Sequence, residues 1–138
     1  METPDTHRGG CLCGAVRYTV DGPLRPVVAC HCKQCQRTSG NYVAATSAPR
    51  EAVTVEGEPR WFASSAEARR AFCPVCGSNL FWDGGAARLS IFAGTLDGPT
   101  GLRLAGHIFC ADKGDWYELD DGLPTYPADD DVMTTRVP

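Results

Sequence analysis

Seven of the eight cysteines in this 138-residue chain stand in three short clusters, and a cysteine thiolate is a ligand for soft metal ions. The clusters are Cys11 with Cys13, then Cys30, Cys32 and Cys35, and finally Cys73 with Cys76. Two pairs can supply the four sulfurs of a closed tetrahedral zinc site, whereas three sulfurs leave one coordination position open. A closed site stabilises a fold and an open one can carry out chemistry. The spacing therefore predicts one structural and one candidate catalytic centre.

The Cys73-x-x-Cys76-Gly77 segment is the strongest single metal motif. Glycine permits the tight turn that lets backbone N–H groups point at the sulfurs. The sequence that follows is strand-like, which favours metal binding over a redox pair. Cys11 and Cys13 form a second bidentate unit. A four-sulfur site made from both units links segments about 60 residues apart, so its metal-binding energy would be folding energy.

Cys30, Cys32 and Cys35 offer three sulfurs to a second ion, and the fourth position is open to water, an incoming ligand, His31 or Cys110. Adjacent side chains of an extended chain point in opposite directions, so we expect His31 to face away, as an imidazole that is exposed or lies near the site. Three thiolates suit the capture of another thiol as thiolate. The natural substrates would then be small thiols or their adducts.

Charge and composition exclude several functions. The net charge is −4, and no basic face for nucleic acid is visible. The acidic excess lies largely at 120–121 and 129–131, which we expect to be solvated. No apolar run is long enough for a membrane span or a signal peptide, so we predict a cytoplasmic protein with reduced thiols. A secreted disulfide scaffold is the alternative, but most cysteines lie too close to a neighbour for bridging.

Short β-type runs separated by turns must position these clusters. Val16, Tyr18 and Val20 alternate with polar residues, which is typical of a half-buried antiparallel strand. Strands are predicted at 15–20, 26–29, 42–46, 52–56, 60–63, 69–72, 79–82, 88–93 and 102–109. We expect a mainly β domain of short antiparallel strands stitched by zinc. Its bounds are 9–127, between a flexible N-terminus at 1–8 and a flexible acidic tail at 128–138.

Four segments carry a family resemblance: GGCLCGAVRY at 9–18, CHCKQCQRTSG at 30–40, FCPVCGS at 72–78, and HIF with a later Trp at 107–116. Together they resemble the glutathione-dependent formaldehyde-activating enzyme family, which includes centromere protein V domains. The resemblance runs from about residue 8 to 127. It implies a β-tent (Mss4-like) fold, with a structural zinc on Cys11, Cys13, Cys73 and Cys76. It also implies a second zinc on Cys30, Cys32 and Cys35, where glutathione and formaldehyde join as S-hydroxymethylglutathione.

We favour an enzyme: a zinc-dependent carbon–sulfur lyase, similar to S-(hydroxymethyl)glutathione synthase. It would handle adducts of glutathione, or another small thiol, with formaldehyde or another aldehyde. Two zinc ions are expected per chain, with the second site partly occupied, and Fe²⁺ fits similar sulfurs. Zinc would act as Lewis acid and thiolate template. Lys33 and Arg37 either contact substrate carboxylates or balance thiolate charge.

The alternative is a non-enzymatic binding module with two closed structural zinc sites, in which Cys110 is the eighth ligand. A third hypothesis is redox chemistry at Cys110, which predicts an accessible thiol of lowered pKa. Cys110 is otherwise interpreted as a small, buried apolar side chain.

Overall fold

The computed structural model describes residues 5–135 and confirms a mainly β fold. The strands are β1 (Thr6–Gly10), β2 (Arg17–Asp21), β3 (Val27–Cys30), β4 (Val43–Pro49), β5 (Val53–Glu56), β6 (Arg60–Ala63), β7 (Arg69–Phe72), β8 (Asn79–Asp83), β9 (Arg88–Phe92) and β10 (Leu104–Ile108). The α-helices are α1 (Lys33–Ser39) and α2 (Asp131–Thr135), and the 3₁₀ turns are η1 (Arg50–Ala52), η2 (Ala93–Thr95) and η3 (Cys110–Asp112). Each predicted strand overlaps one of β2 to β10. Neither α-helix of this described part of the chain is long and apolar enough to span a membrane.

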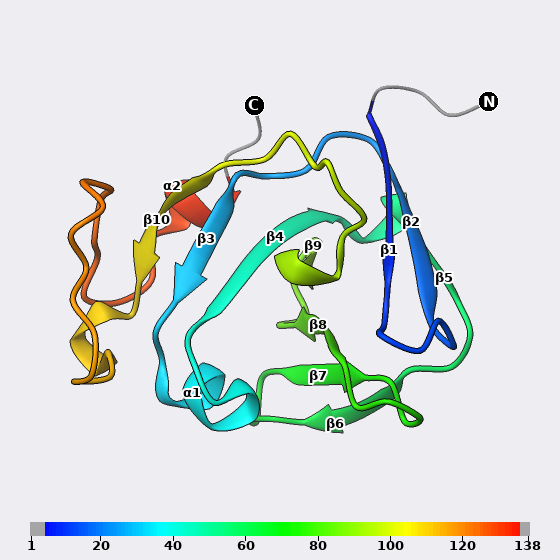
Figure 1. The fold of residues 1–138 in the computed structure, drawn as a ribbon, viewed down its shortest axis with the longest axis horizontal. Helices are drawn as coiled ribbons and strands as arrows, with labels where there is room; N and C mark the ends of the chain where they lie inside the picture. The colour runs from blue at the N-terminus through cyan, green and yellow to red at the C-terminus, as the bar shows by residue number, and fades with distance from the viewer. Residues whose placement is uncertain (1–4, 136–138) are drawn as a thin grey trace.

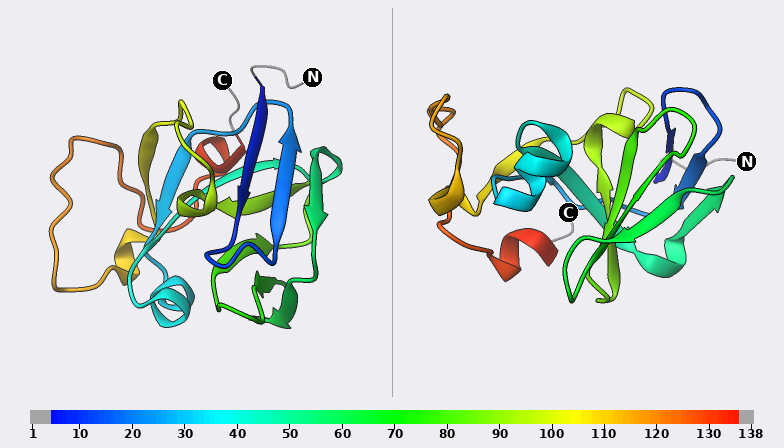
Figure 2. Two further views of the ribbon diagram at one scale, coloured as in Figure 1. Left: turned by 45° about the vertical axis from the view of Figure 1, so that its right-hand side comes forward. Right: turned by 90° about the horizontal axis from the view of Figure 1, so that it is seen from below.

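The strands form two sheets. The smaller has the order β1-β2-β5, and the larger has the order β10-β3-β4-β9-β8-β7-β6. Neighbours pair antiparallel except β10 and β3, which are parallel. The larger sheet bends from β3 and β4 round to β6 and β7, and the smaller sheet stands beside its open side (Figures 1 and 2).

The main core lies between the two sheets. Tyr18 and Val20 of β2 are buried there against Phe81 of β8 and Ile91 of β9. The rings of Tyr18 and Phe81 meet edge to face, with centroids 5.3 Å apart. Each fully buried apolar side chain contributes about 1.5–3 kcal/mol, so this layer fixes how the sheets pack. The alternation predicted in β2 is therefore what joins the smaller sheet to the larger one.

Secondary structure is present in the described parts of both predicted terminal segments, 1–8 and 128–138. β1 begins at Thr6 and pairs with β2 as a polar strand, stabilised by backbone hydrogen bonds that need no apolar alternation. In the acidic tail, Asp130 accepts a hydrogen bond from the Met133 N–H at 2.8 Å and caps α2. The Met133 side chain is buried against Val28 and Ile108. Residues 1–4 and 136–138 lie outside the described chain.

Candidate metal centres

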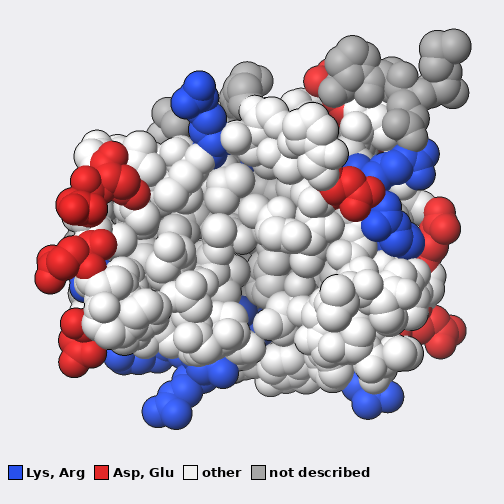
Figure 3. Space-filling model, viewed as in Figure 1, with Lys and Arg blue, Asp and Glu red and all other residues white. Residues whose placement is uncertain are grey.

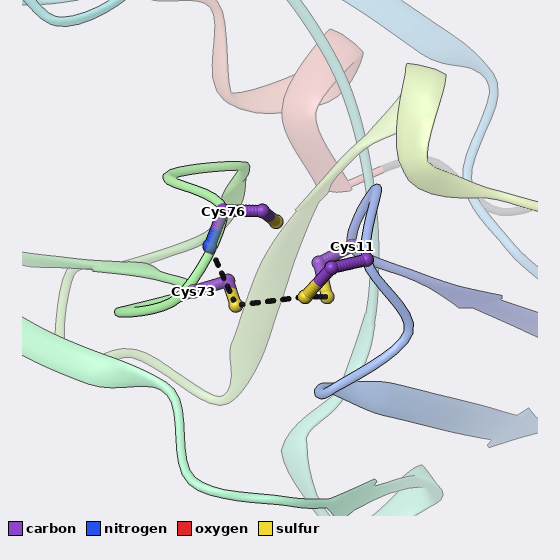
Figure 4. Close-up of side chains that lie close together, drawn as sticks. Cys11, Cys73 and Cys76 are labelled. Atoms are coloured by element: carbon purple, nitrogen blue, oxygen red, sulfur yellow. Dashed lines mark hydrogen bonds between the residues drawn. The ribbon is translucent and has the colours of Figure 1, made fainter.

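The loop between β1 and β2 and the turn between β7 and β8 bring four sulfurs together. The Sγ atoms of Cys11, Cys13, Cys73 and Cys76 all lie within 4.8 Å of one another. The Cys11–Cys13 and Cys13–Cys73 sulfur separations are 3.7 and 3.8 Å, and Figure 4 shows Cys11 facing Cys73 across the gap. Sulfurs placed tetrahedrally at about 2.3 Å from zinc are about 3.8 Å apart. This four-sulfur centre therefore has the dimensions that zinc requires.

Backbone amides shape both halves of the four-sulfur centre. The Val16 N–H donates to the Cys11 sulfur at 3.2 Å, and the Cys76 N–H donates to the Cys73 sulfur at 3.5 Å. Gly77 closes the second turn, with φ at +82° and its N–H on the Cys73 carbonyl at 2.8 Å. That left-handed conformation strains any residue with a Cβ, so the turn needs glycine, as the motif predicts.

Ser78 links the two halves, a role that the sequence did not reveal. Its hydroxyl accepts the Leu12 N–H at 2.9 Å and lies 3.2 Å from the Cys76 sulfur. Hydrogen bonding from Ser78 lowers the pKa of Cys76 to about 5. The side chain therefore joins the two loops and favours the thiolate that metal binding needs.

The three-sulfur centre is assembled where β3 runs into α1. Cys30 ends β3, Cys32 caps the N-terminus of α1, and Cys35 lies in its first turn. Their sulfurs also lie within 4.8 Å of one another. The Cys35 N–H donates to the Cys32 sulfur at 3.3 Å, and Gly40, at φ +81°, ends the helix. The start of α1 thus brings together sulfurs from the residues before the helix and from its first turn.

Crowding prevents these three thiols from ionising independently. The Cys30 and Cys35 thiols lower the pKa of Cys32 to about 2. The same sulfur contacts, followed by burial, raise the pKa of Cys30 above its ordinary value. Three thiolates side by side need a cation to offset their repulsion, and an all-sulfur donor set suits zinc. The residues present therefore fit a zinc ion at this centre.

The side chain of Arg70, which lies on β7 of the larger sheet, extends to the three-sulfur centre. The side chain is only 4% exposed, and its Nη2 donates to the Cys35 sulfur at 3.6 Å. Its Nη1 donates to the Thr38 hydroxyl at 3.3 Å. The Nε–H is buried and has no acceptor within residues 5–135.

Comparison with known proteins agrees with this geometry. The family profile described as glutathione-dependent formaldehyde-activating enzyme matches residues 6–112, most of the chain and all seven clustered cysteines. The chain belongs to this family. It is 25% identical to an uncharacterized lyase of Schizosaccharomyces pombe, over 95% of this chain and 97% of that protein. It is 29% identical to a protein of Halomonas elongata named as a glutathione-dependent formaldehyde-activating enzyme, over 81% of this chain and 80% of that one.

The fold of this formaldehyde-activating enzyme family member also matches a solved structure. A crystal structure of a Rhodobacter sphaeroides protein superposes with a TM-score of 0.59 at 23% identity, covering 72% of this chain and 98% of that one. This similarity supports the arrangement of sheets.

His31 faces away from the three-sulfur centre, as expected, but it is completely buried rather than exposed. Its Nε2 lies 2.9 Å from Nδ1 of His107, and its Nδ1 is hydrogen-bonded to the Tyr117 hydroxyl. Nε2 of His107 in turn lies 2.7 Å from a carboxylate oxygen of Asp121. Burial and the adjacent His107 lower the pKa of His31 to about 4, so it remains neutral at pH 7.

This chain of side chains ties His31, which lies between Cys30 and Cys32, to β10 and the loop after it. Asp121, which we expected to be merely solvated, has a half-exposed side chain and yet holds His107. Tyr117 had no motif of its own, and only its position beside Trp116 of the family segment could have pointed to it. Sequence reasoning therefore missed both partners.

Cys110 belongs to neither sulfur group among the described residues. It lies half-buried in η3, where its N–H donates to the Tyr126 carbonyl at 2.9 Å. Burial raises the pKa of the Cys110 thiol, which is the opposite of what the redox hypothesis predicts.

Lys33 and Arg37 lie one turn apart on α1 and share a pocket of about 330 Å³ with Thr38 and Phe62. None of the three cysteines of the neighbouring centre lines this pocket. In Figure 3 basic side chains gather near α1, acidic ones lie beside the loop after β10, and most of the face is uncharged. The positive charge here is therefore local to the surface around α1.

Proposed function

We propose that this protein is a zinc-dependent carbon–sulfur lyase-type enzyme that joins and separates a small thiol, such as glutathione, and formaldehyde or another aldehyde. The observation that carries the proposal is the three-sulfur centre, because no fourth His, Cys, Asp or Glu ligand atom joins the group within residues 5–135. Such a centre has room for one external ligand. Membership of the family and the names of the relatives support the same chemistry.

The reaction needs little from the protein beyond binding and charge. A carbon–sulfur bond forms between the thiol sulfur and the carbonyl carbon, and the thiol proton passes to the carbonyl oxygen, so no redox reagent is consumed. Zinc bound by Cys30, Cys32 and Cys35 would supply Lewis acidity and favour the thiolate form of the substrate. Lys33 and Arg37 offer two cations to the carboxylates of glutathione. The reverse steps release the aldehyde.

The four-sulfur centre has a structural role in this proposal. It joins the smaller sheet to the β7–β8 turn, and its four sulfurs leave no position for a substrate. Two zinc ions per chain are therefore expected, one closed and one open. Thiol-rich metal centres of this kind are compatible with a reducing compartment, which supports a cytoplasmic location.

The proposal can be tested by measuring exchange between ¹³C-formaldehyde and S-hydroxymethylglutathione by magnetisation-transfer NMR. Wild-type protein with two zinc ions per chain should accelerate exchange in proportion to its concentration. Cys35→Ser should reduce the rate to the uncatalysed value, whereas Cys110→Ser, matched in chemistry but outside both centres, should retain it. A fully zinc-loaded wild type that gives only the uncatalysed rate would contradict the enzyme and favour the binding module.

A further inference from the structure

Two consecutive arginines of β7 have opposite surroundings. The Arg69 side chain is 54% exposed, pairs with Asp83 at 3.4 Å and covers the Trp61 ring at 4.3 Å. Arg70 is buried and takes part in none of the carboxylate ion pairs found within residues 5–135. The hydrogen bonds of its side chain within residues 5–135 go to the Cys35 sulfur and the neutral Thr38 hydroxyl.

A buried guanidinium without a carboxylate is costly unless another negative charge faces it. Removing such an ion from water costs several kcal/mol even after the protein relaxes, and arginine does not lose its proton to escape that cost. The group that can supply the missing charge is the three-sulfur centre. Three thiolates around a divalent ion carry a net charge of −1, and a fourth, anionic ligand makes it −2. The burial of Arg70 is therefore explained if the centre is an anion.

We propose that Arg70 is the counter-ion of the three-sulfur centre and makes its open position prefer an anionic ligand, such as a thiolate, over a neutral one. This inference rests on the proposed function and specifies how that site selects its ligand. The Nε–H of Arg70 has no acceptor within residues 5–135, so it is a donor to which such a ligand can hydrogen-bond. Arg70 acts through charge and hydrogen bonding rather than by coordinating the metal.

The size of the effect follows from Coulomb's law. Loss of one charge–charge interaction over about 6–8 Å at an effective dielectric near 20 weakens binding by about 30- to 100-fold. A neutral ligand gains almost nothing from the same cation, so its affinity should change by less than about threefold.

The test uses protein with Co²⁺ in both centres, whose visible absorption reports a change of ligand at the open position. The probes are 2-mercaptoethanol, which binds as thiolate and has no carboxylate, azide as an anion without a thiol, and imidazole as a neutral ligand. In Arg70→Gln we expect weaker binding of 2-mercaptoethanol and azide, by about 30- to 100-fold, and little change for imidazole. Arg70→Lys should restore part of the loss, and Arg69→Gln is the adjacent control that should resemble wild type.

Equal weakening of all three probes in Arg70→Gln would show that Arg70 only shapes the site, and would overturn the proposal. If Arg70→Gln does not retain two Co²⁺ per chain, a comparison of Arg70→Lys with wild type still tests the proposal. The quantity compared is the affinity for the anionic probes divided by the affinity for imidazole. The proposal requires this ratio to be no higher in Arg70→Lys than in wild type. A wild type that binds azide but no thiol would refute the proposed function while leaving the counter-ion test intact. Failure of the wild type to bind any probe would overturn both.

Discussion

The different roles proposed for the two centres can be tested by removing two ligands from each. Cys73→Ser with Cys76→Ser removes one half of the four-sulfur centre, and Cys32→Ser with Cys35→Ser removes two ligands of the three-sulfur centre. The pairs are matched, because each contains one buried and one half-buried cysteine. Both double variants should lose one zinc ion per chain. They should differ in how much stability is lost with it.

The expected difference comes from the length of chain that each centre closes. The four-sulfur centre joins residues 60 apart, as from Cys13 to Cys73. Closing a loop of that length in the unfolded chain is worth about 4 kcal/mol, whereas closing the five-residue span from Cys30 to Cys35 is worth about 2 kcal/mol. With an unfolding entropy of about 2.1 cal/mol/K per residue, the two losses correspond to about 14 and 7 °C in Tm.

The measurement is thermal unfolding followed by circular dichroism, at equal protein concentration and with metal content determined on the same samples. Cys110→Ser controls for the general effect of exchanging sulfur for oxygen. Equal falls in Tm for the two double variants would refute the argument, because they would show that the four-sulfur centre contributes no more to the fold than the local one. A larger fall for the Cys32 and Cys35 variant would reverse the assignment.

Two further predictions concern charged groups away from the sulfurs. Arg50 holds the pKa of Asp83 at about 2 in the folded protein, below the ordinary 3.8, so this pair stabilises the fold above about pH 4 and loses its effect as the pH falls toward 2. Asp83→Asn should therefore lower Tm at pH 6 but not near pH 2, and a Tm difference independent of pH would contradict the assignment. Asp121→Ala removes the acceptors for His107 and for the Leu123 N–H, and should speed hydrogen exchange of the Leu123 amide. Unchanged exchange in that loop, with β8 as the internal control, would show that Asp121 does not hold it.

Most of the metal-binding geometry could be predicted because the ligands of each half-site are adjacent in sequence. A Cys-x-x-Cys-Gly segment can form its turn with little help, and Gly77 adopts the left-handed conformation that the motif requires. The strands were predictable for a similar reason, since alternation such as that of Tyr18 and Val20 reports directly on one buried face.

The remaining features depend on contacts that local patterns do not encode. Arg69 and Arg70 are the same residue type in sequence, and only the larger sheet determines which one is buried. The contact between His31 and His107 spans 76 residues and requires the parallel pairing of β3 with β10. β1 is polar and contains two glycines, so neither periodicity nor β propensity marks it as a strand.

The two centres also differ in when they become complete during synthesis. A growing chain carries all three ligands of the three-sulfur centre once Cys35 has left the ribosome, before either sheet can close. The four-sulfur centre must wait until Cys76 has emerged and β7 and β8 have formed their turn. Zinc that reaches a nascent chain therefore meets the three-sulfur centre first, and Cys11 and Cys13 stay without their partner cysteines until more than half of the chain has been made. The joining of the two sheets through the four-sulfur centre is therefore a late event in synthesis. It depends on the metal that is still available once more than half of the chain has been made.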